Sequence, residues 1–372
     1  MKTKTVIITG GGTGGHLWPM VSLADEIKNK YEVVILSGTS QNDQTVIGGS
    51  GYKYFRIISG KIHRHNSLWP YLRNIANIIK TIFGIIQALT LLLILRPALI
   101  FSKGGYVSIP VIIAGKILKI PIIVHESDLV IGASNRVALR YAKKFCVSFP
   151  PKYYDLPIDK VIYSGHILRP GIFKSDPIKL KNVRTALKLN SKFPTILVTG
   201  GSQGALSLNK VVAKSLDRLL GIANVIHLSG PNDFYWLNDL KPQTKEEEGR
   251  YLPEGYSHDI LEYMRLSDLI ISRAGSNSLA EIAALKKPAI IVPYRYAAGD
   301  HQKKNAEYFQ NSGGGVVINQ DELSPDVLIN SVKKLLADRA YLKQLGENAY
   351  NANQFGGVKI IAGLINQIAD KL

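Results

Sequence analysis

A glycine-rich turn lies near the start of the chain and leads into a histidine. Gly10–Gly15 follows the apolar run Thr5–Ile8 and ends directly before His16. Glycines let backbone N–H groups approach an anion at the start of a helix, where the helix dipole favours negative charge. An imidazole at that position can serve as a general base, because its ordinary pKa lies near neutrality. The turn predicts an anion site with a proton acceptor; a packing or helix-capping histidine is the alternative.

Two common nucleotide-binding patterns fit this turn poorly. A dinucleotide-dependent dehydrogenase has an acidic residue at the end of its second strand, and that position falls here in Ser37–Ser40, which contains no acid. Asp43 lies past the expected end of that strand. The P-loop pattern G-x-x-x-x-G-K-[ST] does not occur in the chain. Both classes are therefore disfavoured.

Further polar turns follow apolar runs in the second half of the chain. Ser202 lies in the turn Gly200–Ala205. The hydroxyl of Ser202 and the backbone amides of the turn can hold a diphosphate. Ser276 is expected to cap a helix whose second turn carries Glu281, a carboxylate suited to ribose hydroxyls, and Gln302 follows a later strand. A tight strand–helix turn and a capped helix with a solvent-facing glutamate are the alternatives. No Asp-x-Asp motif is present, so no metal is expected.

The charge of the chain is large and uneven. The 372 residues carry a formal net charge of +18, and no acidic residue occurs between Asp43 and Glu126. Such a stretch attracts nucleic acid, an anionic membrane or a phosphorylated substrate, or is simply a solvated face. Nucleic acid is disfavoured, because the basic residues alternate with Ile and Leu rather than with exposed aromatic residues. Cys146 is the single cysteine, which fits a reducing compartment, and no secretory signal is recognised, so we expect a cytoplasmic protein.

One apolar segment interrupts the otherwise regular pattern. The run Thr81–Leu95 is uncharged but only 15 residues long, whereas a membrane span needs about 20. Upstream, an apolar stripe that includes Trp69, Ile75, Ile79 and Phe83 recurs at helical spacing with basic neighbours. This pattern is typical of a helix that lies on an anionic bilayer, and a core-facing helix remains open as the alternative.

The elements that must position these residues alternate between apolar strands and helices. This alternation predicts an α/β fold with parallel sheets, and the pattern restarts at Thr195–Val198 after a second strand–glycine–helix opening. Two Rossmann-like domains are therefore expected, one over residues 1–165 and one over residues 166–355. The helical segment from about residue 356 to residue 372 is expected to pack back on the first domain.

The motifs, in their order and spacing, resemble the MurG family of glycosyltransferases over nearly the whole chain. Six segments carry the resemblance: Gly11–His16, Gly104–Ser108, His125–Asp128, Gly200–Ala205, Arg273–Glu281 and Asp300–Asn305. The resemblance implies the GT-B fold, in which two Rossmann-like domains face a deep cleft.

The same resemblance implies a specific reaction. N-acetylglucosamine would pass with inversion from UDP-N-acetylglucosamine to an acceptor, undecaprenyl-diphosphate-linked N-acetylmuramyl-pentapeptide, at the cytoplasmic side of the cell membrane. The polyprenyl-diphosphate acceptor requires a peripheral protein at an anionic membrane surface, and no cofactor is implied. The alternative is another lipid-acceptor UDP-sugar glycosyltransferase, such as a diacylglycerol glycosyltransferase.

The resemblance also assigns roles to individual residues. His16 would be the base. Glu281 would bind the ribose, and we expect it to be a catalytic residue together with His16. The other residues implied to contact substrate are Thr13, Gly14, Gly15, Asp128, Arg169, Ser202, Ser276, Ser278 and Gln302. Asp128 departs from the family, because many members have Asn there and an ionised carboxylate cannot donate a hydrogen bond. Arg169 follows Gly165-His166-Ile167, where Gly-Asn-Pro is common in the family.

Overall fold

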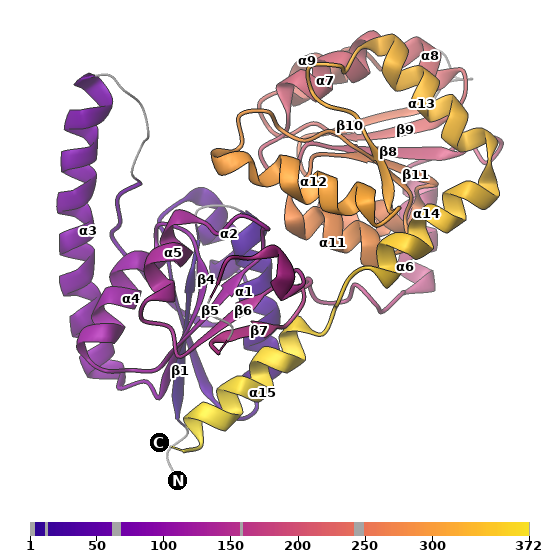
Figure 1. The fold of residues 1–372 in the computed structure, drawn as a ribbon. Helices are drawn as coiled ribbons and strands as arrows, with labels where there is room; N and C mark the ends of the chain where they lie inside the picture. The colour runs from indigo at the N-terminus through magenta and orange to yellow at the C-terminus, as the bar shows by residue number, and fades with distance from the viewer. Residues whose placement is uncertain (1–3, 12–13, 62–67, 157–158, 242–248, 372) are drawn as a thin grey trace. The chain divides into compact units, whose positions relative to one another are not determined.

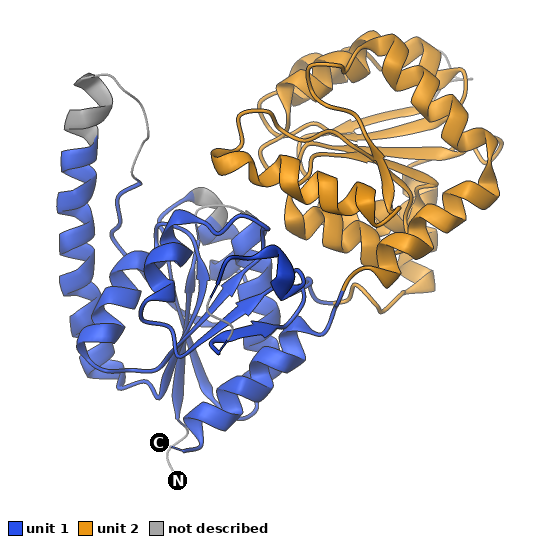
Figure 2. Cartoon of the chain, viewed as in Figure 1, with its two compact units in different colours: residues 1–170, 354–372 blue, residues 171–353 orange. Residues whose placement is uncertain are grey.

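The chain folds into two compact units, each with its own parallel sheet (Figure 1). The computed structural model describes residues 4–11, 14–61, 68–156, 159–241 and 249–371. Unit 1 comprises residues 1–170 and 354–372, and unit 2 comprises residues 171–353 (Figure 2).

The sheet of unit 1 has the strand order β3-β2-β1-β4-β5-β6-β7, and all of its pairs are parallel. Its strands are β1 (Thr5–Gly10), β2 (Glu32–Ser37), β3 (Lys53–Arg56), β4 (Leu99–Gly104), β5 (Ile122–Glu126), β6 (Lys144–Val147) and β7 (Val161–Tyr163). Its helices are α1 (Gly14–Ile27), α2 (Gln41–Gly48), α3 (Leu68–Leu95), α4 (Ser108–Ile117), α5 (Ala133–Leu139) and α15 (Gly357–Ala369), with a short 3-10 turn η1 (Pro151–Tyr153). β1, β4 and β5 are buried along their whole length, which explains their unbroken apolar character.

The sheet of unit 2 repeats this arrangement with the order β10-β9-β8-β11-β12-β13, again all parallel. Its strands are β8 (Thr195–Thr199), β9 (Asn224–Leu228), β10 (Tyr251–Glu254), β11 (Leu269–Ser272), β12 (Ala289–Ile291) and β13 (Gly315–Val317). Its helices are α6 (Pro177–Ala186), α7 (Leu206–Lys214), α8 (Leu216–Leu220), α9 (Phe234–Asn238), α10 (Ile260–Leu266), α11 (Ser276–Ala284), α12 (His301–Asn311), α13 (Pro325–Ala337) and α14 (Arg339–Asn351), with a 3-10 turn η2 (Ala298–Asp300).

Both sheets reverse their strand order at their first strand. The chain moves outward from β1 to β3 and then returns to the other side of β1 with β4; in unit 2, β8 and β11 are the corresponding pair. In open parallel sheets, ligands bind outside the carboxyl ends of the strands at this switch point. The prediction of two Rossmann-like α/β domains is confirmed, and each domain has one switch point.

The last helix belongs to unit 1, although the rest of the second half forms unit 2. α15 packs on α1 and buries Ile361 and Ile365 in the core of unit 1. Lys4 Nζ donates to the carbonyl of Ala369 at 2.8 Å, and Tyr31 Oη donates to Asn366 Oδ1 at 2.9 Å. The chain therefore crosses between the units twice.

The apolar segment forms a longer helix than its uncharged run suggested. α3 has 28 residues, and Asn74–Leu95 is long and apolar enough to cross a membrane by length and composition, with 17% of its most apolar window buried. α3 packs against α4 through a buried face that contains Gly84, Ala88 and Leu92 (Figure 1). The core-facing alternative thus holds for the part of the helix that follows Phe83, whereas none of the described residues from Asn74 to Phe83 is buried.

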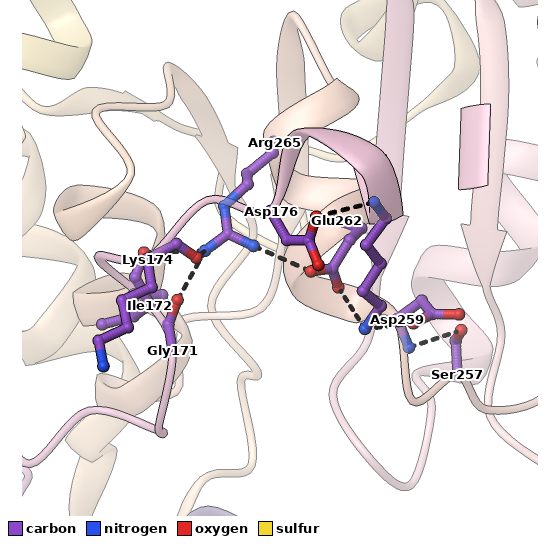
Figure 3. A network of polar contacts seen from close by, with 9 residues as sticks. Gly171, Ile172, Lys174, Asp176, Ser257, Asp259, Glu262 and Arg265 are labelled. Carbon is purple, nitrogen blue, oxygen red and sulfur yellow. Dashed lines mark hydrogen bonds and ion pairs between the residues drawn. The ribbon is translucent and has the colours of Figure 1, made fainter. Parts of the chain in front are cut away.

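A polar network holds the first segment of unit 2 against α10. Figure 3 shows Arg265, whose guanidinium donates to the carbonyls of Gly171, Ile172 and Lys174 and pairs with Glu262 at 3.0 Å. Lys179 of α6 pairs with Asp259 at 2.8 Å and with Glu262 at 3.4 Å. The segment that enters unit 2 is therefore fixed to that unit immediately after Gly171.

Two glycines of α15 allow a matched test of its packing. A Cβ added at Gly357 would lie 2.5 Å from the carbonyl oxygen of His166, whereas one added at Gly363 would meet nothing within 4 Å. We expect Gly357→Ala to lower the free energy of unfolding by about 1–3 kcal/mol. Gly363→Ala should leave it unchanged or raise it by up to about 1 kcal/mol, since alanine favours helix. Urea unfolding monitored by circular dichroism measures both, and equal effects would contradict this packing.

Candidate functional site

A buried aspartate lies beside the first glycines that follow β1. Gly11 has φ of 143°, and a Cβ there would lie 2.5 Å from Asp43 Oδ1. Ser37 Oγ lies 2.6 Å from the carbonyl oxygen of Gly10 and 2.5 Å from Asp43 Oδ1. Asp43 is fully buried and also contacts Ser40. The sequence places Asp43 past the end of the strand, and α2 returns its side chain to the end of β1, beside Gly11.

His16 lies in the first turn of α1, at the carboxyl end of β1. Burial lowers the pKa of His16 to about 4, because it disfavours the charged imidazole. The positive charge of Lys103 acts in the same direction, while Asp128 and Asp43 oppose it. The imidazole is therefore neutral near pH 7, which is the form that accepts a proton. Gly14 and Gly15 begin the same helix, and Thr13 lies outside the described residues.

Asp128 follows β5 and lies in a loop that a buried carboxylate organises. Glu126 accepts hydrogen bonds from the backbone N–H groups of Asp128 at 3.0 Å and Gly132 at 2.8 Å, and from Asn135 Nδ2 at 3.0 Å. Burial raises the pKa of Glu126, and the nearby charge of Asp128 raises it further. Since β5 is adjacent to β4, which is adjacent to β1, this loop and His16 lie at the same edge of the sheet.

Arg169 lies beside the helix that carries His16. Its guanidinium is 5.3 Å from the ring centroid of Trp18, two residues after His16 on α1. Ser22 Oγ donates to the carbonyl of Leu168 at 2.8 Å, which fixes the adjacent backbone to the same helix. The structure thus places His16, Asp128 and Arg169 in unit 1. His16 lies on α1, and Arg169 packs against Trp18 of the same helix.

In unit 2, the turn after β8 presents polar side chains at the switch point. Gly201 and Gly204 have φ of 83° and 75°. Residues with side chains rarely adopt this positive-φ conformation, so the turn requires glycine at both positions. Ser202 lies between them and is exposed. The turn is followed by α7, whose Ser207 accepts a hydrogen bond from Arg273 at 2.5 Å. This contact ties the start of α7 to the end of the adjacent strand β11.

The turn after β11 differs from the prediction in its capping residue. Gly275, with φ of −68° and ψ of 129°, is the N-cap of α11, so Ser276 is the first helical residue rather than the cap. Gly275 has no side chain that could act as a cap, and no side-chain hydrogen bond caps this end of α11. Asn305 Nδ2 donates to the carbonyl of Ala274 at 3.1 Å and steadies the turn. Ser276 is buried and Ser278 is half-buried.

Glu281 and Gln302 lie on the two helices next to this turn. Glu281 is 6% exposed, so the alternative of a solvent-facing glutamate is wrong. Gln302, the second residue of α12, accepts a hydrogen bond from the backbone N–H of Tyr294 at 2.9 Å. That contact orients the amide group of Gln302 toward the end of β12.

Arg273 is a buried cation that the sequence marked only as part of a motif. Its guanidinium donates to the carbonyl of Val292 at 3.1 Å as well as to Ser207. Burial lowers the pKa of Arg273 to about 10. Arg273 therefore connects the ends of β11 and β12 to α7. Within the described ranges, no group of three or more His, Cys, Asp or Glu residues is arranged to hold a metal ion.

Comparison with known proteins identifies the family. The glycosyltransferase family 28 N-terminal domain matches residues 6–147, and the family 28 C-terminal domain matches residues 195–360. The chain belongs to glycosyltransferase family 28. The motif-based resemblance is thereby confirmed, and both glycine turns lie inside the matched family 28 domains.

The family 28 relatives of this chain share its full length. It is 33% identical over 368 residues to the UDP-N-acetylglucosamine–N-acetylmuramyl-(pentapeptide) pyrophosphoryl-undecaprenol N-acetylglucosamine transferase of Clostridium botulinum (strain Hall), covering 98% of this chain and 99% of that protein. A protein of the same name from Lachnospira eligens is 34% identical over 342 residues, covering 90% and 92%.

Solved structures support the GT-B fold of the family. The crystal structure of Acinetobacter baumannii MurG superposes with a TM-score of 0.72 at 23% identity and covers 98% of this chain and 99% of that one. The calicheamicin glycosyltransferase CalG4 gives a TM-score of 0.69 at 12% identity, covering 100% of both chains. At these identities the likeness concerns the fold alone.

Buried histidines predict a pH-dependent stability. Burial lowers the pKa of His166 to about 3 and that of His227 to about 4, and both rings are at most 1% exposed. The unfolded chain binds these protons near pH 6.5, so the free energy of unfolding should fall as pH drops from 6.5 toward 4.

Urea unfolding at pH 7.5 and pH 5 measures this effect. His227→Asn should show a smaller decrease between the two pH values than the wild type, because one buried histidine no longer titrates in the unfolded state. His258→Asn removes an exposed ring and serves as the control. Equal unfolding free energies of the wild type at the two pH values would refute the expectation.

Proposed function

We propose that this protein transfers N-acetylglucosamine from UDP-N-acetylglucosamine to the 4-hydroxyl of N-acetylmuramyl-pentapeptide on undecaprenyl diphosphate, with inversion. Relatives that match 90% or more of the chain are named as N-acetylglucosamine transferases of UDP-N-acetylglucosamine and N-acetylmuramyl-(pentapeptide) pyrophosphoryl-undecaprenol. The structural observation that carries the proposal is the position of His16 in the first turn of α1, at the carboxyl end of β1 and at the switch point of unit 1. A neutral base beside an anion-ready turn suits deprotonation of a sugar hydroxyl on a phosphorylated acceptor.

In our proposal unit 2 holds the nucleotide. The buried carboxylate of Glu281 accepts hydrogen bonds from the ribose hydroxyls, and backbone N–H groups at the start of α11 face the diphosphate. Ser202, Ser276 and Ser278 add hydroxyl donors, and Gln302 contributes its amide group to the sugar or diphosphate. In unit 1, Gly14 and Gly15 are proposed to offer backbone N–H groups to an anion, and Arg169 a positive charge.

The proposed transfer is a single displacement. The acceptor oxygen attacks the anomeric carbon while His16 takes its proton, and the bond between that carbon and the diphosphate oxygen breaks. The electron pair leaves with UDP, whose growing negative charge is stabilised by the helix N-terminus and Arg169. Attack from the face opposite the leaving group inverts the anomeric configuration.

We also propose that α3 holds the protein at the cytoplasmic face of the membrane as a peripheral protein. Ile75, Ile79 and Phe83 are 42%, 49% and 60% exposed. Ile75 lies nine positions before the buried Gly84, and Ile79 lies nine positions before the buried Ala88. Nine residues make about two and a half helical turns, so the exposed isoleucines lie on the side of α3 opposite to the buried residues. One face is thus committed to α4 while the other offers apolar side chains with basic neighbours, which fits a helix lying on an anionic surface. The side chain of Trp69 lies outside the described part of the chain.

A transfer assay with His16→Ala tests the reaction. Wild-type protein should move labelled N-acetylglucosamine from UDP onto a lipid-linked N-acetylmuramyl-pentapeptide analogue. Loss of the base should lower turnover by about 10²–10⁴-fold while UDP binding, measured by calorimetry, persists. His258→Ala, which removes an exposed histidine, is the control and should keep wild-type turnover.

Two outcomes of this assay would overturn the proposal. An unchanged turnover number in His16→Ala would remove His16 from the role of base. Transfer to diacylglycerol from UDP-glucose or UDP-galactose, without transfer to the muramyl acceptor, would favour the diacylglycerol glycosyltransferase alternative.

Vesicle binding tests the membrane face. We expect wild-type protein to co-sediment with anionic vesicles at low salt, and the pair of substitutions Ile79→Ser and Phe83→Ser to weaken partitioning by roughly tenfold or more. Ile178→Ser removes a comparably exposed apolar side chain from α6 in unit 2 and should have no effect. Wild-type protein that stays in solution would refute the membrane role.

A further inference from the structure

Two exposed tyrosines follow β12 in unit 2. Tyr294 is 42% exposed and Tyr296 is 70% exposed, and both lie just beyond the carboxyl end of the strand. Their ring centroids are 5.8 Å apart with an interplanar angle of 71°, so the edge of one ring meets the face of the other. Two large aromatic rings exposed side by side form a surface suited to covering an apolar face of a ligand.

An arginine lies against each of the two rings. The guanidinium of the buried Arg273 is 5.6 Å from the ring centroid of Tyr294. The guanidinium of Arg295 is 5.6 Å from the ring centroid of Tyr296, and it pairs with Asp321 at 2.6 Å. These cation–π contacts restrain the rings in the absence of ligand. A restrained side chain loses less conformational entropy when a ligand binds to it.

The loop that carries the tyrosines is also fixed by its own backbone. The N–H of Ala297 donates to the carbonyl of Tyr294 at 3.2 Å, and the N–H of Asp300 donates to the carbonyl of Ala297 at 3.0 Å. Asp300 has φ of 56°, a left-handed conformation that residues other than glycine seldom adopt. Strained backbone of this kind occurs often at ligand-binding loops, where the surrounding structure holds it in place. The loop therefore presents the two rings in a defined arrangement.

The pair of tyrosines lies next to residues that the proposed function places on the donor. The backbone N–H of Tyr294 donates to Gln302 Oε1 at 2.9 Å, and Gln302 is proposed to reach the sugar or the diphosphate. β12 pairs with β11, and the start of α11, the helix after β11, is proposed to face the diphosphate. The sugar is attached to that diphosphate, so the loop after the neighbouring strand β12 is well placed to contact it.

We propose that Tyr296 is a sugar-binding residue, whose ring packs against the N-acetylglucosamine ring of the donor while Tyr294 holds it in position. This inference rests on the proposed function, because it presumes that unit 2 holds the UDP-sugar. Apart from the diphosphate, the substituents of the N-acetylglucosamine ring are equatorial, so its C–H groups form apolar faces. The rigid face of a tyrosine ring can cover such a surface, and its hydroxyl can remain in water.

The test compares the affinities of UDP-N-acetylglucosamine and UDP, measured by calorimetry on the full chain without acceptor. Tyr296→Ser should weaken the binding of UDP-N-acetylglucosamine by roughly threefold to tenfold and leave the binding of UDP unchanged. Tyr296→Phe keeps the aromatic face and should restore tight binding of the sugar nucleotide. Tyr235→Ser removes a tyrosine of α9 in the same unit that is 78% exposed; it is the matched control and should change neither affinity.

The uracil base is the other flat group of the donor, and the same experiment separates the two. Equal weakening of UDP and UDP-N-acetylglucosamine in Tyr296→Ser would overturn the inference, because it would place the ring on the nucleotide. Unchanged affinities in Tyr296→Ser would overturn it too. Absence of UDP binding by the wild type would instead reject the proposed nucleotide site of unit 2, and the inference with it.

Discussion

The geometry of an open parallel sheet is the constraint on which the rest of this molecule depends. In each unit the chain adds strands on one side of the first strand and then returns to add strands on its other side. The connections that follow β1 and β4 therefore lead to opposite sides of the sheet, as do those that follow β8 and β11. Backbone N–H groups at the start of the following helices are left without helical partners and point away from the sheet edge. The same topology, used twice, supplies two sites at which an anion can be held by main-chain groups.

Around the switch point of unit 1, buried polar groups replace what would otherwise be apolar packing. Asp43 contacts Ser37 beside Gly11, Glu126 accepts hydrogen bonds from the loop after β5, and Lys103 is buried near the end of β4. Buried charges of both signs are tolerated because hydrogen bonds and opposite charges surround them. Removal of water from this region strengthens each electrostatic effect, which is why the pKa values of His16, Glu126 and Lys103 all depart from their ordinary values.

α3 serves a different purpose from the other helices of unit 1. A helix that only covers the sheet would bury its apolar side chains, but α3 leaves a row of isoleucines and a phenylalanine exposed while small residues on its opposite side approach α4 closely. An exposed apolar surface of this kind is costly in water and marks a site of interaction. A lipid-linked acceptor would give this surface a role, because its carrier stays in the bilayer.

The sequence alone determined the fold class, the family and the glycine turns that follow the strands. These are local properties: glycines reveal turns through the backbone conformations that only they adopt readily, and apolar runs reveal buried strands through their periodicity. Only the tertiary structure decided which charged side chains are buried. In the sequence Asp43 and Lys103 look like ordinary surface residues, and a solvent-facing side chain was an open alternative for Glu281, yet α2, β4 and α11 respectively place these three side chains in the interior. The physical reason is that burial, and the pKa values that follow from it, depend on residues that are distant along the chain and meet only in the folded protein.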